Sequence, residues 1–94
     1  EVNGVTPAEF GLKQNYPNPF NPATKIGFTL PMESNVKITV YNLIGQKVGE
    51  LVNSKFSAGN HSVDFNASNL SSGIYLYKIE AGNFTSVKKM QLMK

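Results

Sequence analysis

Residues 36–52 read VKITVYNLIGQKVGELV, two apolar runs with a turn signal between them. Val36, Ile38 and Val40 alternate with more polar residues, which is the period of a β-strand with one buried face. The tetrad at residues 42–45 ends in Gly45 and predicts a turn, and a second apolar run follows it. Residues 36–52 are therefore expected to form a β-hairpin.

The same period continues outward from this hairpin in both directions. Two triplets each share one strand face: Ile26, Phe28 and Leu30, then His61, Val63 and Phe65. Residues 74–81 read IYLYKIEA and begin apolar on both faces, as expected of a central strand. Residues 84–93 predict a final strand. Val87 falls out of step there with Met90 and Leu92, and a β-bulge would reconcile them.

A proline-rich segment precedes the first of these strands and reads YPNPFNP at residues 16–22. Proline fixes φ and pushes its predecessor to extended geometry, so the segment is expected to be stiff, kinked and extended. We expect it to separate the domain from what precedes it, with Tyr16 and Phe20 anchored in the core. The structural motif residues are Tyr16, Pro17, Asn18, Pro19, Phe20, Asn21 and Pro22, together with the turn glycines Gly45 and Gly59.

The pattern as a whole predicts an all-β fold. It contains six or seven short strands about ten residues apart with turn signals between them, and no segment has a helical period. This favours an antiparallel immunoglobulin- or fibronectin-III-like β-sandwich of about seven strands. A chain of 94 residues is long enough for one such domain. We expect a linker at residues 1–11 and the sandwich at 12–94; Glu1 in place of Met indicates a piece of a longer polypeptide.

Composition and motifs exclude several classes of function. The net charge is +3, but all nine basic residues are Lys and most are scattered, which argues against nucleic-acid binding. The absence of Cys excludes disulfides and thiolate metal sites. His61 is the only histidine, and its phase with Val63 and Phe65 favours a half-buried structural role. No carboxylate pair or nucleophile motif occurs, so we expect no enzyme, cofactor, metal or small-molecule substrate.

Two features leave alternatives open. Tyr41, Tyr75 and Tyr77 could form a sugar-binding face, although tyrosines on a sheet more often brace neighbouring strands. The closing residues 88–94 read KKMQLMK. They fit either a last strand whose lysines prevent edge aggregation, or an exposed strand that a receptor captures by backbone pairing. On the second interpretation, removing residues 91–94 should leave the sandwich largely folded.

Several stretches together resemble a known family in its own order of motifs: NYPNPFNP at 15–22 with Thr24, Ile26 and Phe28, VYNLIGQKV at 40–48, AGNH at 58–61, SGIY at 72–75 and KMQLMK at 89–94. The chain resembles the type A C-terminal sorting domain of the type IX (Por) secretion system over about residues 12–94. It departs from that family at Asn42, where Asp is frequent, and at Phe65, where Trp is frequent.

The resemblance implies a non-catalytic immunoglobulin-like signal that directs an upstream cargo protein across the outer membrane of a Gram-negative bacterium. Its implied partners are the outer-membrane translocon, a sortase-like peptidase that cuts before or within residues 1–10, and the cargo in the same chain. The cargo would cross the periplasm and then be secreted or held at the cell surface. Residues matching the recognition motifs are Gly73, Tyr75, Lys89, Leu92 and Lys94. The alternative is a structural spacer similar to the immunoglobulin-like domain of flagellar hook-capping proteins.

Overall fold

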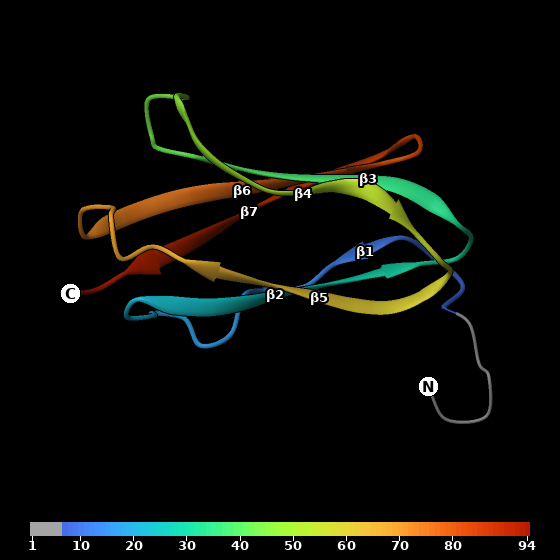
Figure 1. Cartoon of the computed structure of the whole chain (residues 1–94), viewed down its shortest axis with the longest axis horizontal. Coiled ribbons are helices and arrows are strands. Elements are labelled where there is room, and N and C mark those ends of the chain that lie inside the picture. Colours follow the sequence, from blue (N-terminus) through green and yellow to red (C-terminus); the bar gives the residue numbers. More distant parts are fainter. Residues whose placement is uncertain (1–6) are drawn as a thin grey trace.

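Strand β2 (Ala23–Leu30) shows how the predicted alternation builds the fold. Its residues Ile26, Phe28 and Leu30 are fully buried, while Lys25 points to solvent. Successive side chains of a strand point to opposite faces, so one face of β2 covers the core and the other is wet. The computed structural model describes residues 7–94, and it confirms the all-β prediction (Figure 1).

Two antiparallel sheets face each other to form the sandwich (Figure 1). The strands of the described chain are β1 (Gly11–Leu12), β2 (Ala23–Leu30), β3 (Ser34–Tyr41), β4 (Lys47–Phe56), β5 (Gly59–Asn66), β6 (Gly73–Ala81) and β7 (Phe84–Leu92). The first sheet has the order β1-β2-β5 and the second has the order β4-β3-β6-β7. This arrangement confirms the prediction of an immunoglobulin- or fibronectin-like sandwich. Strand β4 belongs to the second sheet, because it pairs with β3 and not with β5.

The predicted hairpin is formed by β3 and β4, with pairing from Ser34 opposite Phe56 to Tyr41 opposite Lys47. Two register shifts interrupt it, after Ile38 and after Val40. Such irregularities bend a strand and discourage further pairing along its outer edge. As predicted, β6 is a central strand, because it pairs with β3 on one side and β7 on the other.

The bulge predicted for the last strand is absent. Strand β7 pairs with β6 in unbroken register from Phe84 opposite Ala81 to Leu92 opposite Gly73. Met90 and Leu92 are buried, whereas Val87 is 51% exposed because it lies on the outer face. Val87 is out of step with the two core residues because it belongs to the other face, so the strand needs no extra residue.

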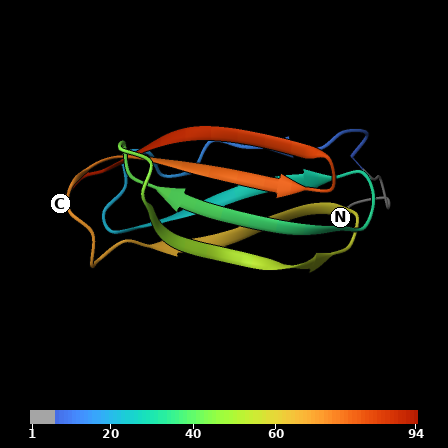
Figure 2. The same ribbon diagram turned by 90° about the horizontal axis from the view of Figure 1, so that it is seen from above.

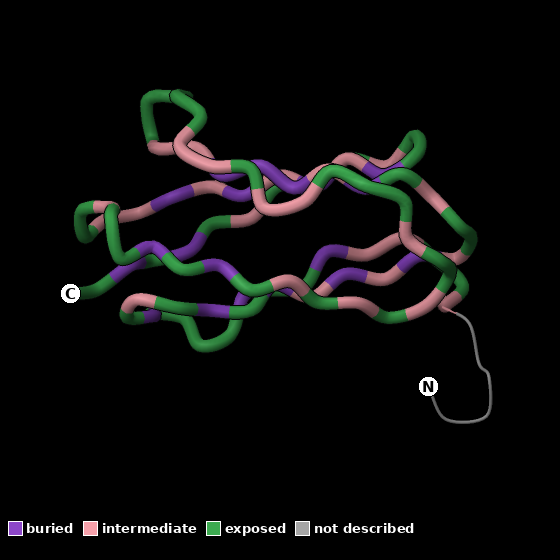
Figure 3. The backbone as a smooth tube through the Cα atoms, viewed as in Figure 1, coloured by how far each residue is buried: buried purple, intermediate pink, exposed green. Residues whose placement is uncertain are grey.

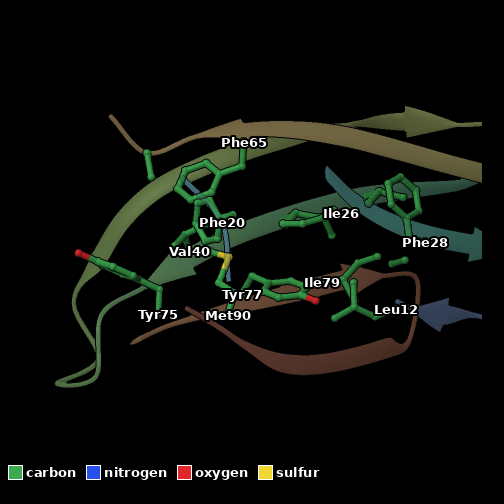
Figure 4. Packing of buried hydrophobic residues seen from close by; sticks show 14 of the residues in the cluster. Leu12, Phe20, Ile26, Phe28, Val40, Phe65, Tyr75, Tyr77, Ile79 and Met90 are labelled. Carbon is green, nitrogen blue, oxygen red and sulfur yellow. The ribbon is translucent and has the colours of Figure 1, made fainter. Parts of the chain in front are cut away.

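The core lies between the sheets and is drawn from six of the strands, from the loop before β2 and from the loop after β5 (Figures 3 and 4). Its buried members are Leu12, Phe20, Ile26, Phe28, Leu30, Val36, Ile38, Val40, Phe65, Ala67, Tyr75, Tyr77, Ile79, Ala81, Met90 and Leu92. Phe20 and Phe65 pack with ring centroids 6.1 Å apart at one end of this core. Burial on this scale supplies the main driving force for folding.

His61 takes part in packing at the other end of the core. Its half-buried ring stacks on Phe28 at 5.4 Å and meets the edge of Phe56 at 5.0 Å. Its Nε2 atom lies 2.8 Å from the carbonyl oxygen of Ser57, which accepts the hydrogen bond. These contacts give the side chain a structural role in the β4–β5 corner.

The described chain begins and ends at opposite ends of its longest axis, which measures 40 Å (Figures 1 and 2). Phe10 stacks on Phe84 at 5.4 Å, and Gly11 pairs with Thr29. The packed sandwich therefore includes residues within the stretch expected to be a linker, while residues 1–6 of that stretch lie outside the described residues. Within residues 7–94, no helix has the length and hydropathy needed to cross a bilayer.

Candidate functional site

The loop between β1 and β2 crosses from the first sheet to the second. Residues 13–16 continue beside β2, where Tyr16 and Lys25 exchange two backbone hydrogen bonds of 2.9 and 3.0 Å. Four residues later, Phe20 forms a parallel bridge with Leu92 of β7. The proline-rich segment therefore does not separate the sandwich from what precedes it. It is part of the sandwich, because Phe20 is inserted into the core and holds the segment there.

Backbone hydrogen bonds connect this loop to the outer edge of β7. The Phe20 N–H donates to the Gln91 carbonyl at 3.0 Å, and the Met93 N–H donates to the Phe20 carbonyl at 2.9 Å. The outward-facing groups of a strand alternate with those facing its partner strand. Gln91 and Met93 thus use the groups that point away from β6.

Two side-chain amides extend the same contact along β7. The Asn18 Oδ1 atom accepts a 2.9 Å hydrogen bond from the Gln91 N–H, and Gln14 Nε2 donates to the Lys89 carbonyl at 2.6 Å. The partners lie 73 and 75 residues apart in the sequence. We call the resulting surface the composite edge, defined as residues 13–20 together with residues 85–94.

The composite edge limits how a partner could pair with the last strand. β7 is an edge strand, but its outward backbone groups from the Lys89 carbonyl to the Met93 N–H are occupied by the chain itself. Within the described residues, the outward backbone N–H and C=O groups of Thr85 and Val87 form no hydrogen bond with the loop between β1 and β2. Within β7, the part of the edge that lacks this internal pairing is therefore the first half of the strand.

The two aromatic residues of the proline-rich segment have different environments. Phe20 is 2% exposed and lies in the core, as expected, but Tyr16 is 81% exposed, so the prediction that it anchors in the core is wrong. Tyr16 pairs with Lys25, whose side chain points outward, and adjacent outward positions share a face. It borders an open groove of about 560 Å³ that is lined by Tyr16, Pro17, Ala23, Thr24, Lys25, Asp64, Phe65 and Asn66.

Asn15 fixes the start of the loop from inside the protein. It is 2% exposed, and its Nδ2 donates to the Pro17 carbonyl and to Thr24 Oγ1, both at 3.1 Å. The Thr24 hydroxyl donates to the same Pro17 carbonyl at 2.9 Å. Sequence reasoning assigned no role to Asn15, Thr24 or Gln14. Asn15 and Thr24 are buried polar residues, which interrupt the apolar pattern and leave no periodic signal. Gln14 is exposed, and its partner lies 75 residues away.

Tyr77 connects β6 to the same loop across the core. Its fully buried hydroxyl donates to the Lys13 carbonyl at 2.7 Å and accepts from the Asn15 N–H at 2.8 Å. Burial raises the pKa of Tyr77 to about 12, because the phenolate would lose its hydration, although the Asn15 N–H favours the ionised form. The phenol thus satisfies two backbone groups that would otherwise be buried without partners.

We predict that Tyr77 makes the domain less stable at high pH. Its folded-state pKa of about 12 lies above the ordinary value of 10.0, so its contribution is complete below pH 10 and is lost as the pH rises through 12. Relative to the Tyr77→Phe variant, the free energy of unfolding should fall by up to about 3 kcal/mol over that range. Urea unfolding of both proteins at pH 9 and pH 12 measures this difference. Parallel pH profiles for the two proteins would contradict it.

Gly73 and Tyr75 stand at the start of β6, where the loop 67–72 ends. Tyr75 is 8% exposed, and its hydroxyl donates to the Ser71 carbonyl at 2.7 Å, four residues upstream. A tyrosine that braces a strand corner in this way is a recurrent feature of immunoglobulin-like sandwiches. Gly73 has φ +152°, a region in which side chains are strained.

Replacing Gly73 with Ala is therefore expected to lower the free energy of unfolding by about 1–3 kcal/mol. The cost is backbone strain alone, since a Cβ atom at this position meets no atom within 4 Å. Gly49→Ala is a matched control, because its Cβ is equally unobstructed and its φ is not in the glycine region. Thermal unfolding followed by circular dichroism compares the variants. Equal stability of the two would show that Gly73 is not conformationally required.

The closing residues divide into exposed and buried positions. The side chain of Lys89 is exposed on the outer face of β7, whereas Leu92 is 1% exposed and belongs to the core. Lys94 is exposed, but its Nζ donates to the Ser68 carbonyl at 2.7 Å and its N–H donates to Ser72 Oγ at 3.1 Å. A partner on the folded domain can therefore reach the two lysines and not Leu92.

The turn residues lie where the sequence predicted turns. Gly45 closes the β3–β4 turn with φ +87°, and its N–H donates to the Asn42 carbonyl at 3.1 Å. Asn42 Oδ1 also accepts hydrogen bonds from Ile44 and Gln46, so the amide at this position supplies the acceptor that an Asp would supply. Gly59 begins β5 after the β4–β5 turn.

The tyrosine face considered from the sequence does not form. Tyr75 and Tyr77 point into the core, whereas Tyr41 lies on the outer face of β3, where Lys78 Nζ sits 6.0 Å from its ring centre. Aromatic recognition of a sugar requires rings that share one accessible face. These three tyrosines cannot provide one.

The observations define a class of protein: an immunoglobulin-like β-sandwich whose distinctive site is a strand edge built from two distant segments. The chain belongs to the family described as the secretion system C-terminal sorting domain, whose model matches residues 14–93. A comparison with curated proteins finds no match. The family provides non-catalytic sorting signals for type IX secretion. It implies export to the cell surface or medium, contact with the secretion machinery, and an upstream cargo domain.

Proposed function

We propose that this domain directs an upstream cargo protein across the outer membrane through the type IX translocon, and that a sortase-like peptidase then removes it. The observation that carries the proposal is the family match over residues 14–93. The first and last residues of the matched range, Gln14 and Met93, both lie in the composite edge. The domain itself acts by binding and performs no catalysis.

Within this proposal, the five motif residues have two kinds of role. Lys89 and Lys94 contact the secretion machinery, because their side chains are exposed at the composite edge. Gly73, Tyr75 and Leu92 support recognition indirectly, because they shape the β6 corner and hold β7 against the core. The peptidase cuts on the N-terminal side of Phe10, since Phe10 is packed against Phe84.

A reporter fused in front of residues 1–94 tests the proposal. In a Gram-negative host with an active type IX system, we expect the reporter in the medium or at the cell surface. In the same host without the outer-membrane translocon, we expect it in the periplasm. Retention in the periplasm of both hosts would reject the sorting function and favour a structural spacer.

A further inference from the structure

We propose that the composite edge as a whole binds an acidic protein surface of the secretion machinery, so that the two ends of the domain are recognised as one unit. This inference rests on the proposed function and specifies the partner's chemistry. A linear terminal peptide would carry only half of the site, because residues 13–20 supply the other half.

The distribution of charge supports an acidic partner. The composite edge contains Lys13, Lys88, Lys89 and Lys94 and no carboxylate side chain. The rest of the chain has five lysines and six carboxylates, so the entire positive net charge of +3 arises at this edge. At the opposite edge, β4 and β5 carry two lysines and two carboxylates, so their charges balance; these are Lys47, Lys55, Glu50 and Asp64. Association of complementary patches is steered by such an asymmetry.

The hydrogen bonds of the loop explain how lysines from distant segments come to the same edge of the sandwich. The 2.6 Å contact from Gln14 Nε2 to the Lys89 carbonyl joins the residue that follows Lys13 to β7. Tyr77 holds the Lys13 carbonyl from within the core at 2.7 Å. The Lys13 stem lies over Gly27 on the outer face of the first sheet, and Lys89 is exposed on the outer face of β7. The two ammonium groups therefore flank one rigid edge from its two sides. A site fixed before binding loses little conformational entropy when a partner docks.

The internal hydrogen bonds on the outer edge of β7 determine which chemical groups a partner can contact there. Because the outward backbone groups from Lys89 to Met93 are paired internally, a partner meets side chains there rather than free N–H and C=O groups. The exposed side chains along this part include the amides of Asn18 and Gln91, the ammonium group of Lys94 and the single apolar side chain of Met93. A lipid surface would instead require a broad apolar face for insertion. Carboxylates on a protein match the groups that are present.

Charge reversal on the full reporter fusion tests this inference. The variant Lys13→Glu/Lys89→Glu changes the composite edge, and Lys47→Glu/Lys55→Glu makes the same change in net charge on β4. All four side chains are exposed, so both variants should fold. We expect the edge variant to lower exported reporter about tenfold or more, while the β4 variant exports like the parent protein. Thermal unfolding of both purified domains confirms that they are folded.

The possible outcomes separate this inference from the proposed function. If the parent fusion is exported and both folded variants are exported equally, or both are equally impaired, the composite edge is not the acidic partner's site, although the sorting function stands. If the parent fusion is not exported, the sorting function itself fails. Sedimentation with phosphatidylglycerol vesicles tests whether the composite edge binds a membrane instead of a protein. Binding of the parent domain that is lost in the edge variant would assign the edge to a membrane and overturn the inference.

Discussion

Removing residues 91–94 is expected to lower the free energy of unfolding by more than about 4 kcal/mol, a large part of the stability of a small domain. The truncation deletes the buried side chain of Leu92, and this loss alone leaves a cavity in the core the size of one large aliphatic residue. It also removes the hydrogen bonds that Gln91 and Met93 form with Phe20. Urea unfolding followed by circular dichroism measures the loss.

A shorter truncation provides the control. Removing only Met93 and Lys94 keeps Leu92 and the Gln91 contacts, so we expect a loss of about 1–2 kcal/mol. A four-residue truncation that is as stable as this control would contradict the prediction. The expectation that the sandwich survives loss of residues 91–94 is not supported by the structure, because Leu92 is a core residue. Point changes at Lys89 or Lys94 therefore test recognition better than truncation does.

Replacing Phe20 with Ala is expected to lower the free energy of unfolding by about 3–5 kcal/mol. The ring is 2% exposed and packs on Phe65, so the substitution leaves a cavity at one end of the core. It should also loosen the loop from β7, because burial of the Phe20 ring holds its backbone beside Gln91 and Met93. Hydrogen exchange at the Gln91 and Met93 amides reports this loosening separately from global unfolding.

Tyr16→Ala is the matched control for this experiment, since it removes an aromatic ring from the same motif. Tyr16 is 81% exposed, so its replacement should change the free energy of unfolding by no more than about 0.5 kcal/mol. Equal losses for the two variants would refute the assignment of Phe20 as the single aromatic anchor of the segment. The pair also shows which part of the motif supports the fold and which part is available at the surface.

The strands and their buried faces could be predicted from the sequence, because alternation is a local property. Ile26, Phe28 and Leu30 are all buried as their spacing indicated, and Gly45 closes the turn that it was expected to close. The same reasoning went wrong where one pattern had two interpretations. Val87 needs a bulge only if it is a core residue, whereas a residue on the outer face is also out of step with Met90 and Leu92.

The composite edge could not be predicted, because its contacts are formed by side chains and backbone groups far apart in the sequence. Nothing in the residues around Gln14 indicates that its amide meets the Lys89 carbonyl, 75 positions later. The different environments of Tyr16 and Phe20 could not be predicted from the sequence either. Both are aromatic residues next to prolines, and only the path of the loop across the sheet edge distinguishes them.

The placement of the two ends of the sandwich has a consequence for the range of passengers that one such domain can accompany. Residue 7, where the described chain begins, lies at one pole, and Lys94 lies at the other, along a body 40 Å long. A bulky passenger at the first pole leaves the second uncrowded. The same domain can therefore be combined with passengers of very different size and shape without hiding its last residues.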